Sequence, residues 1–249
     1  MIQILLLLIC LFAYRASAQP DYVVTVKGDT VYGKIRLLNY NNDQKIQLTD
    51  ASRKKTIYGK LQFKVFTIAG DLYHPIRTPQ GYVIMKLLKP GYLSLYAFQM
   101  ENQITWDGQY LYKRDGAGLE VSSLLFKKRL TNFLAECSEL AAKIESKELS
   151  RNDLEEIIDQ FNECIDQRTK EAATQSAIAS KLDELETAVK ALEESENKTT
   201  ALEVITELRL KVQRGEKVPS LFGKTLLDAL TAYPELTELA QAALREVQR

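Results

Sequence analysis

Two amphipathic segments, each with one cysteine, constrain the fold of this chain more than any other feature. Between Ser122 and Arg168, apolar residues recur every three or four positions, which is typical of helices that bury one face. The apolar positions are Leu130, Phe133, Leu134, Cys137, Leu140, Ala141 and Ile144 in the first segment, and Leu154, Ile157, Ile158, Phe161, Cys164 and Ile165 in the second. Between the segments, Ser150 followed by Asp153 is a capping-box pattern that predicts the start of the second helix.

The two cysteines lie symmetrically about this turn in the sequence. An antiparallel hairpin would bring Cys137 and Cys164 level with each other on facing apolar stripes, so the spacing predicts a disulfide. Closing a loop of this length stabilises a chain by roughly 3.5 kcal/mol if the effect is entropic. The alternative is a pair of buried free thiols that pack as small hydrophobic side chains.

The N-terminal residues favour the disulfide because they predict export. An apolar run over residues 4–13 precedes Ala16-Ser17-Ala18, a small-x-small pattern typical of signal peptidase sites. The run is too short to span a bilayer, and no later stretch approaches spanning length. We predict a signal peptide over residues 1–18 and a mature chain from Gln19, periplasmic or secreted, where disulfides persist. The alternative, lipoprotein processing at Cys10, is disfavoured by the bulky Ile9 before it.

Charge divides the chain into two parts, although it contains 33 Lys and Arg and 33 Asp and Glu in total. Residues 21–130 carry 17 basic and 9 acidic residues, whereas residues 131–249 carry 15 and 24. This division predicts parts of different architecture. We expect an α+β protein in four segments, which are the signal peptide (1–18), an antiparallel β domain (19–120), the two-cysteine helical hairpin (121–168) and a C-terminal α-helical region (169–249).

The β domain is predicted from short alternating runs rich in Val, Ile, Tyr and Thr, separated by Gly-, Pro- and Asn-containing turns. This spacing indicates an antiparallel meander that closes into a small sandwich or partial barrel. The predicted strands are Asp21–Lys27, Thr30–Leu38, Lys45–Thr49, Thr56–Ile68, Leu72–Arg77, Tyr82–Lys89, Tyr92–Gln99 and Ile104–Lys113.

An internal repeat indicates two related strands in this domain. The segment Thr30-Val31-Tyr32-Gly33-Lys34-Ile35 recurs as Thr56-Ile57-Tyr58-Gly59-Lys60-Leu61. Period-two alternation places the apolar residues and both glycines on the inner face, where a glycine usually marks a bulge or a close backbone crossing.

The outer face of the repeat is a candidate binding face, because tyrosine supplies packing area and lysine and arginine attract anions. Its residues are Tyr32, Lys34, Arg36, Tyr58, Lys60 and Lys64. A simpler interpretation is an ordinary solvated sheet face, on which cross-strand Tyr and Lys pairs are common. A third is that this face contacts the acidic helices of the same chain.

Several short motifs, taken in order, resemble a group of uncharacterised exported proteins of the Bacteroidota. They are Gly28-Asp29-Thr30-Val31-Tyr32-Gly33-Lys34, Gly91-Tyr92-Leu93-Ser94-Leu95-Tyr96, Phe126-Lys127-Lys128, Glu136-Cys137-Ser138-Glu139-Leu140 and Phe161-Asn162-Glu163-Cys164. The resemblance covers residues 21–168 and leaves 169–249 outside. It implies an envelope location and a β domain followed by a two-cysteine hairpin, and it implies no reaction.

The C-terminal region is predicted to be a small helical bundle. Apolar residues alternate at four- and three-residue intervals from Ile178 to Leu192, too briefly for a coiled coil, so this seam should pack against helices of the same chain. Thr200 with Glu203 predicts a further helix that Gly215 ends, and Pro219 and Pro234 suit the first turns of two more. A peptide-binding helical repeat is the alternative.

The sequence contains no constellation that predicts catalysis. His74 is the only histidine, and it is expected to be structural, since a triad also needs a nucleophile and an orienting acid. The chain lacks HExxH, GxSxG, a Gly-rich phosphate loop and CxxC, so we predict no catalytic residue, no metal site and no cofactor. Export and the near-neutral charge argue against nucleic acid as a partner.

We therefore expect an exported, non-catalytic protein that recognises another envelope component, through the β domain, the C-terminal helices or both. The partner would be an envelope protein or an anionic envelope ligand. The alternative from another class is a carboxylate-dependent hydrolase of envelope glycan, because the separation of two carboxylates cannot be read from sequence. A structural accessory subunit held by the helices is a third interpretation.

Overall fold

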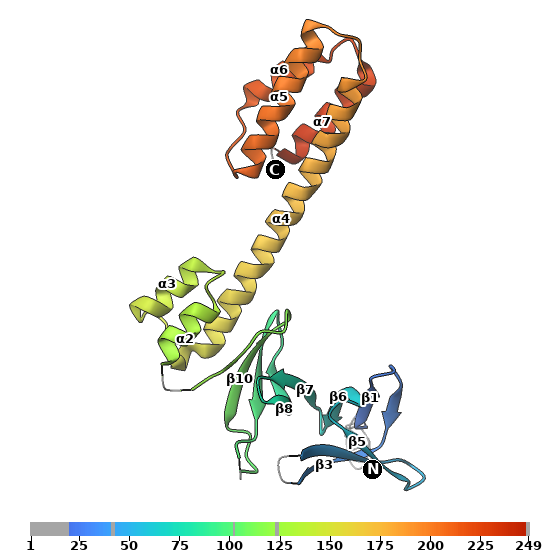
Figure 1. Cartoon of the computed structure of the whole chain (residues 1–249), viewed down its shortest axis with the longest axis vertical. Helices are drawn as coiled ribbons and strands as arrows, with labels where there is room; N and C mark the ends of the chain where they lie inside the picture. Colours follow the sequence, from blue (N-terminus) through green and yellow to red (C-terminus); the bar gives the residue numbers. More distant parts are fainter. Residues whose placement is uncertain (1–19, 41–42, 102, 123–124, 248–249) are drawn as a thin grey trace, which may run out of the picture. The chain divides into compact units, whose positions relative to one another are not determined.

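A computed structural model of the chain describes residues 20–40, 43–101, 103–122 and 125–247 (Figure 1). The predicted signal peptide over residues 1–18 lies outside these ranges. The chain divides into two compact units, the first ending at Asn162 and the second beginning at Glu163. Antiparallel sheets followed by helices confirm the predicted α+β class. No described helix is both long enough and apolar enough to cross a membrane.

The described strands form two antiparallel sheets. The larger has eight strands in the order β11-β10-β9-β8-β7-β6-β1-β2, so that β6 to β11 form the predicted meander. Its strands are β1 (Tyr22–Thr25), β2 (Thr30–Tyr32), β6 (Phe63–Ile68), β7 (Asp71–Thr78), β8 (Gly81–Lys89), β9 (Leu93–Phe98), β10 (Gly108–Lys113) and β11 (Gly118–Glu120). The smaller has the order β3-β4-β5, with β3 (Lys34–Tyr40), β4 (Asp43–Thr49) and β5 (Lys55–Gly59).

The two sheets share one hydrophobic core, as in the predicted small sandwich. Its members are Val23, Ile35, Ile46, Leu48, Phe63, Phe66, Tyr73 and Ile84, which come from both sheets. The predicted strands Thr30–Leu38 and Thr56–Ile68 are each wrong in one respect, because each is two strands in different sheets. Gln62 ends β5 in a turn, donating its backbone N–H to the carbonyl of Gly59 at 2.9 Å and accepting the Gly59 N–H on its side chain.

The two repeat glycines both lie where the chain passes from one sheet to the other. Gly33 joins β2 to β3, and a Cβ placed there would overlap the carbonyl oxygen of Thr49, which confirms a close backbone crossing. Gly59 ends β5, and the nearest atom to a Cβ there is the Gln62 side-chain oxygen at 3.8 Å. The predicted close approach is therefore wrong at Gly59.

The hairpin contains three helices where two were predicted. They are α2 (Phe126–Phe133), α3 (Ser138–Ser146) and α4 (Leu154–Lys190), the last preceded by the 3-10 turn η1 (Arg151–Asp153). In a continuous first helix the Cys137 N–H would reach the carbonyl of Phe133. Instead Lys113 on β10 donates to that carbonyl at 2.6 Å, and the Cys137 N–H turns to Leu134. A lysine distant in sequence thus ends α2 early.

The remainder of the hairpin follows the sequence pattern. Ser150 caps η1 in a capping box with Asp153, as predicted. Cys137 and Cys164 form the predicted disulfide. Most side chains of the two predicted stripes are buried, with Leu130, Leu134, Ile157, Ile158 and Phe161 fully inaccessible. The exceptions are Phe133, Cys164 and Ile165, which are half-buried, while Leu149, outside the stripes, is also buried.

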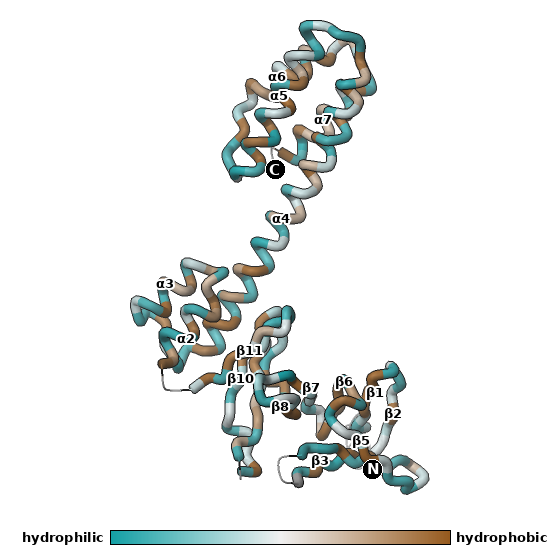
Figure 2. The backbone as a smooth tube through the Cα atoms, in the orientation of Figure 1, coloured by the Kyte–Doolittle hydropathy of each residue, from teal (hydrophilic) through white to brown (hydrophobic). Residues whose placement is uncertain are grey.

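The second unit is a helical bundle built from the end of α4 with α5 (Glu196–Gln213), α6 (Ser220–Ala229) and α7 (Pro234–Val247). Hydrophobic positions recur along these helices (Figure 2). The predicted seam supplies Ile178, Leu182, Leu185 and Val189 to the core. Ser195 caps α5, so the predicted cap at Thr200 is wrong. Helix α4 passes through position 168 without a break, and residues 166–177 are exposed on every side.

Candidate binding surface

The structure distributes the six predicted binding residues over both sheets. Tyr32 lies on β2, 56% exposed, with its ring 6.0 Å from that of Tyr22. Lys34 and Arg36 are exposed on β3 of the small sheet, and the remaining three residues are Tyr58 on β5, Lys60 in the β5–β6 turn and Lys64 on β6. The structure therefore brings only Lys34 and Arg36 together on one strand face.

Tyr58 faces the core, which corrects the predicted orientation of the second repeat copy. Its register partner is Ile46, and it packs against the core between the sheets, while Ile57 is 53% exposed. The prediction treats residues 56–68 as one continuous strand, in which Ile57 faces inward like Phe63 and Tyr58 faces outward. The turn after Gly59 breaks that alternation, so even-numbered residues face inward before it.

The strand register defines a basic face on the outside of the small sheet. Lys34 pairs with Thr49, and Thr49 with Lys55, so the two lysines lie on either side of a threonine, about 10 Å apart. The next row on this face is Arg36, Gln47 and Ile57, about 7 Å along the strands. We call Lys34, Arg36, Lys45 and Lys55, with these intervening residues, the basic face.

The electrostatics of the basic face favour an anion. Residues 33–60 contain seven Lys and Arg against two Asp and Glu. Among the described residues, no ion pair joins Lys34, Arg36 or Lys55 to a carboxylate, whereas Lys45 contacts Asp43 at 2.9 Å. The hydrogen bond from Lys45 lowers the pKa of the Asp43 carboxyl, which therefore stays ionised and offsets that one lysine. Three cations remain available to a ligand.

Sequence reasoning missed Lys55 as part of this face. Lys55 precedes the repeat and carries no motif of its own. The signal that would have found it is the register of β4 with β5, which depends on the length of the turn over residues 50–54. In that turn Asp50 accepts the backbone N–H of Lys54 at 2.9 Å.

The large sheet also carries an aromatic cluster around His74, which is separate from the core that the two sheets share. Tyr96, Tyr110 and Tyr112 lie on neighbouring strands there, and the Tyr96 hydroxyl is 3.3 Å from Nδ1 of His74. Burial lowers the pKa of His74 and raises the pKa of Tyr96 to about 12, so both groups are neutral near pH 7. A neutral pair of this kind packs the sheet and supplies no charge.

The hairpin packs against the ends of β9 and β10 through fully paired polar groups. Lys113, whose side chain is 5% exposed, donates to Glu136 at 2.6 Å and lies over the Phe133 and Phe161 rings. The Asn162 amide accepts the Leu93 N–H at 2.7 Å and donates to its carbonyl at 3.1 Å. We call these contacts the hairpin junction.

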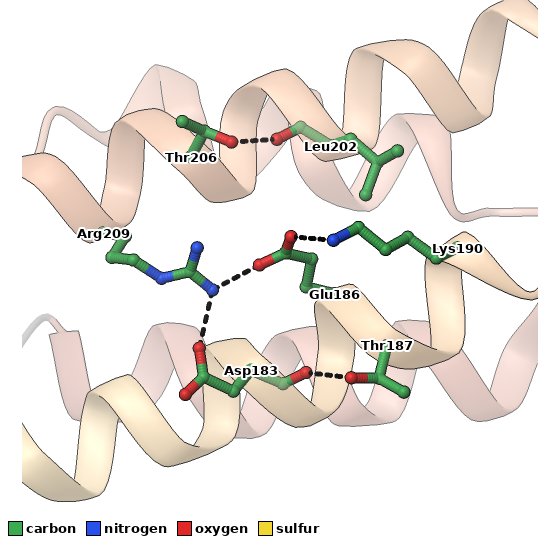
Figure 3. Close-up of polar contacts among 7 residues, drawn as sticks. All are labelled: Asp183, Glu186, Thr187, Lys190, Leu202, Thr206 and Arg209. Carbon is green, nitrogen blue, oxygen red and sulfur yellow. Dashed lines mark hydrogen bonds and ion pairs between the residues drawn. The ribbon is translucent and has the colours of Figure 1, made fainter.

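In the helical unit, an ion-pair network links α4 to α5. The Arg209 guanidinium contacts both Asp183 and Glu186, and Glu186 also pairs with Lys190 (Figure 3). These contacts lower the pKa of Glu186 and raise that of Arg209. The network satisfies its own charges, so it holds the two helices in register.

Two further observations bear on chemistry. Within the described ranges, no group of three or more His, Cys, Asp and Glu residues is placed to hold a metal ion. The carboxyl groups whose pKa departs clearly from its ordinary value, Asp50 and Asp153 among them, all have a lowered pKa.

Comparison of the chain with known protein families, curated proteins and solved structures finds no match.

Proposed function

We propose that this chain is an exported, non-catalytic envelope protein that binds an anionic envelope component through the basic face. The observation that carries the proposal is the trio Lys34, Arg36 and Lys55, which are exposed on one sheet face and form no ion pair with any carboxylate in the part of the chain that the structure describes. Each exposed Lys or Arg near an anionic lipid surface contributes about 1 kcal/mol of attraction. Three such residues on a rigid sheet need little ordering when a ligand binds.

The disulfide and the N-terminal pattern support export. A disulfide persists in oxidising compartments, and it closes the hairpin that follows the β domain. The predicted signal peptide, with the resemblance to exported envelope proteins over residues 21–168, agrees with this compartment. Binding is favoured over glycan hydrolysis because the basic face presents three exposed cations, which attract an anion, whereas a glycosidase site is built from two carboxyl groups.

The test is cosedimentation of the mature chain with phosphatidylcholine vesicles, with and without phosphatidylglycerol. We expect binding only to the anionic vesicles, weakened by added salt. The variant Lys34→Gln/Arg36→Gln/Lys55→Gln should weaken it by about 100-fold, since three cations at about 1 kcal/mol each are lost.

A matched control removes the same charge elsewhere in the same unit. Lys27→Gln/Arg77→Gln/Arg114→Gln alters three exposed cations outside the basic face. This control should bind nearly as well as the unaltered chain. Equal losses in the two variants, or equal binding to neutral and anionic vesicles, would contradict the proposal.

A further inference from the structure

A second basic site lies in the hairpin, away from the basic face. A groove of about 410 Å³ runs between the start of α2, the end of α3 and the turn that leads to η1. It is lined by Leu125, Phe126, Lys127, Ile144, Lys147, Leu149, Ser150 and Arg151. Its volume is within the range of small-molecule sites, about 300 to 1,000 Å³.

The charge of the groove has one sign. Lys127, Lys147 and Arg151 are all exposed, and no acidic residue lines the groove. Among the described residues, none of the three forms an ion pair with a carboxylate. The first turn of α2 also lacks an acidic residue and a side-chain cap, so its backbone N–H groups add to the positive potential. An anionic group is therefore the complementary occupant.

The rest of the lining is apolar. Ile144 and Leu149 are buried at the base, and Leu125 is 62% exposed at the edge. Leu125 and Lys147 both have positive φ, 57° and 69°, a conformation that costs energy for residues with a Cβ. A ligand that fits this lining needs an anionic head and a hydrocarbon portion, because exposed leucine beside three cations favours both.

We propose that this groove binds a phosphate monoester that carries an alkyl chain, as in a lysophosphatidate. The phosphate head has a charge of about −1.5 to −2 at pH 7, which matches three cations better than one carboxylate does. Lys127, Lys147 and Arg151 hold the head, and Leu125, Ile144 and Leu149 contact the chain. This site uses none of the residues of the basic face, so it does not depend on the proposed function.

The test is calorimetric titration of the full mature chain with octyl phosphate, compared with inorganic phosphate and octanoate. Octyl phosphate should bind the most tightly of the three. The variant Lys127→Gln/Lys147→Gln/Arg151→Gln should weaken octyl phosphate binding by at least about tenfold, since charge-assisted hydrogen bonds are lost. The control Lys128→Gln/Lys170→Gln/Lys217→Gln, with exposed lysines outside the groove, should bind normally.

A second variant separates the apolar contact from the charge. In Leu125→Asn the side chain becomes polar at a position whose positive φ asparagine tolerates, so the fold should persist. It should weaken octyl phosphate and leave inorganic phosphate unchanged. The proposal is overturned if octyl phosphate binds no more tightly than inorganic phosphate or octanoate, if Leu125→Asn leaves octyl phosphate binding unchanged, or if the charge variant and its control bind equally.

Discussion

The basic face and the hairpin junction both contain lysine, but the side chain is exposed in one and buried in the other. At the hairpin junction, Lys113 is buried and donates to a carbonyl and a carboxylate at 2.6 Å. On the basic face, Lys34 and Lys55 are exposed, and neither forms an ion pair with another described residue. A buried, paired charge is costly to disrupt, whereas an exposed one hardly affects stability. Changes at the junction should therefore destabilise the chain, and changes on the basic face should alter binding with little effect on stability.

Removal of the disulfide should cause the largest loss of stability. Cys137→Ser/Cys164→Ser opens the hairpin and should cost about 3.5 kcal/mol, because the unfolded chain regains the freedom of that loop. Urea unfolding followed by the fluorescence of Trp106, the sole tryptophan, reports the β domain. Reduction of the unaltered chain should shift the same midpoint. An unchanged midpoint in both cases would contradict the role of the disulfide.

Loss of the junction lysine should cost almost as much. Lys113→Ala removes the donor to the Phe133 carbonyl and the buried lysine that pairs with Glu136, for an expected loss of about 3 kcal/mol. Lys34→Ala, the matched change on the basic face, should stay within about 0.5 kcal/mol. Both changes in stability are measured from the midpoint of urea unfolding, followed by Trp106 fluorescence. Similar losses of stability in Lys113→Ala and Lys34→Ala would contradict the different roles of the hairpin junction and the basic face.

The repeat glycines should differ in their tolerance of a methyl group. Gly33→Ala pushes a Cβ into the Thr49 carbonyl and should cost about 2 kcal/mol, since backbone cannot move aside easily. Gly59→Ala meets only the end of a flexible glutamine, so its effect should be well below that of Gly33→Ala. Equal midpoints for the two variants would contradict the close crossing at Gly33.

The junction should also show a modest dependence on pH. Burial is the largest single influence on Glu136 and acts to raise its pKa, but the hydrogen bond and charge of Lys113, together with a backbone hydrogen bond, outweigh it and hold the pKa below its ordinary 4.5. Because the folded pKa is depressed, the stabilisation is fully present above about pH 4.5 and is lost as pH falls through the folded pKa. In Glu136→Gln, the urea midpoint should change less as pH falls over this range. Glu139→Gln, a substitution of another exposed carboxylate, is the control, and its urea midpoint should follow pH as that of the unaltered chain does.

Local patterns predicted much of the fold, since their causes lie within a few residues. The Ser150 capping box and the Ile178–Val189 seam depend on residues a few positions apart, and both are confirmed. The disulfide is confirmed as well, because the two cysteines lie at equal distances from a turn that is itself readable from the sequence. Long-range causes were invisible. The early end of α2 depends on Lys113, and the inward turn of Tyr58 depends on a change of sheet after Gly59.

The candidate site was predicted only in part, for the same reason. Lys34 and Arg36 follow from alternation along one strand, whereas Lys55 joins them only through the register of β4 with β5. Tyr58 was assigned to the outer face because a strand was assumed to continue through a turn. Register between strands is fixed by turns and packing, which one strand's alternation does not contain.

The most direct measurement of the central claim is lysine acetylation of the mature chain, followed by mass spectrometry, with and without phosphatidylglycerol vesicles. Bound lipid phosphates should protect Lys34 and Lys55 from the reagent, because these amines contact the anionic surface. Lys27 and Lys170, exposed elsewhere, should react equally in both samples. Protection spread evenly over all four lysines, or its absence at Lys34 and Lys55 while the chain is bound, would contradict the assignment of binding to the basic face.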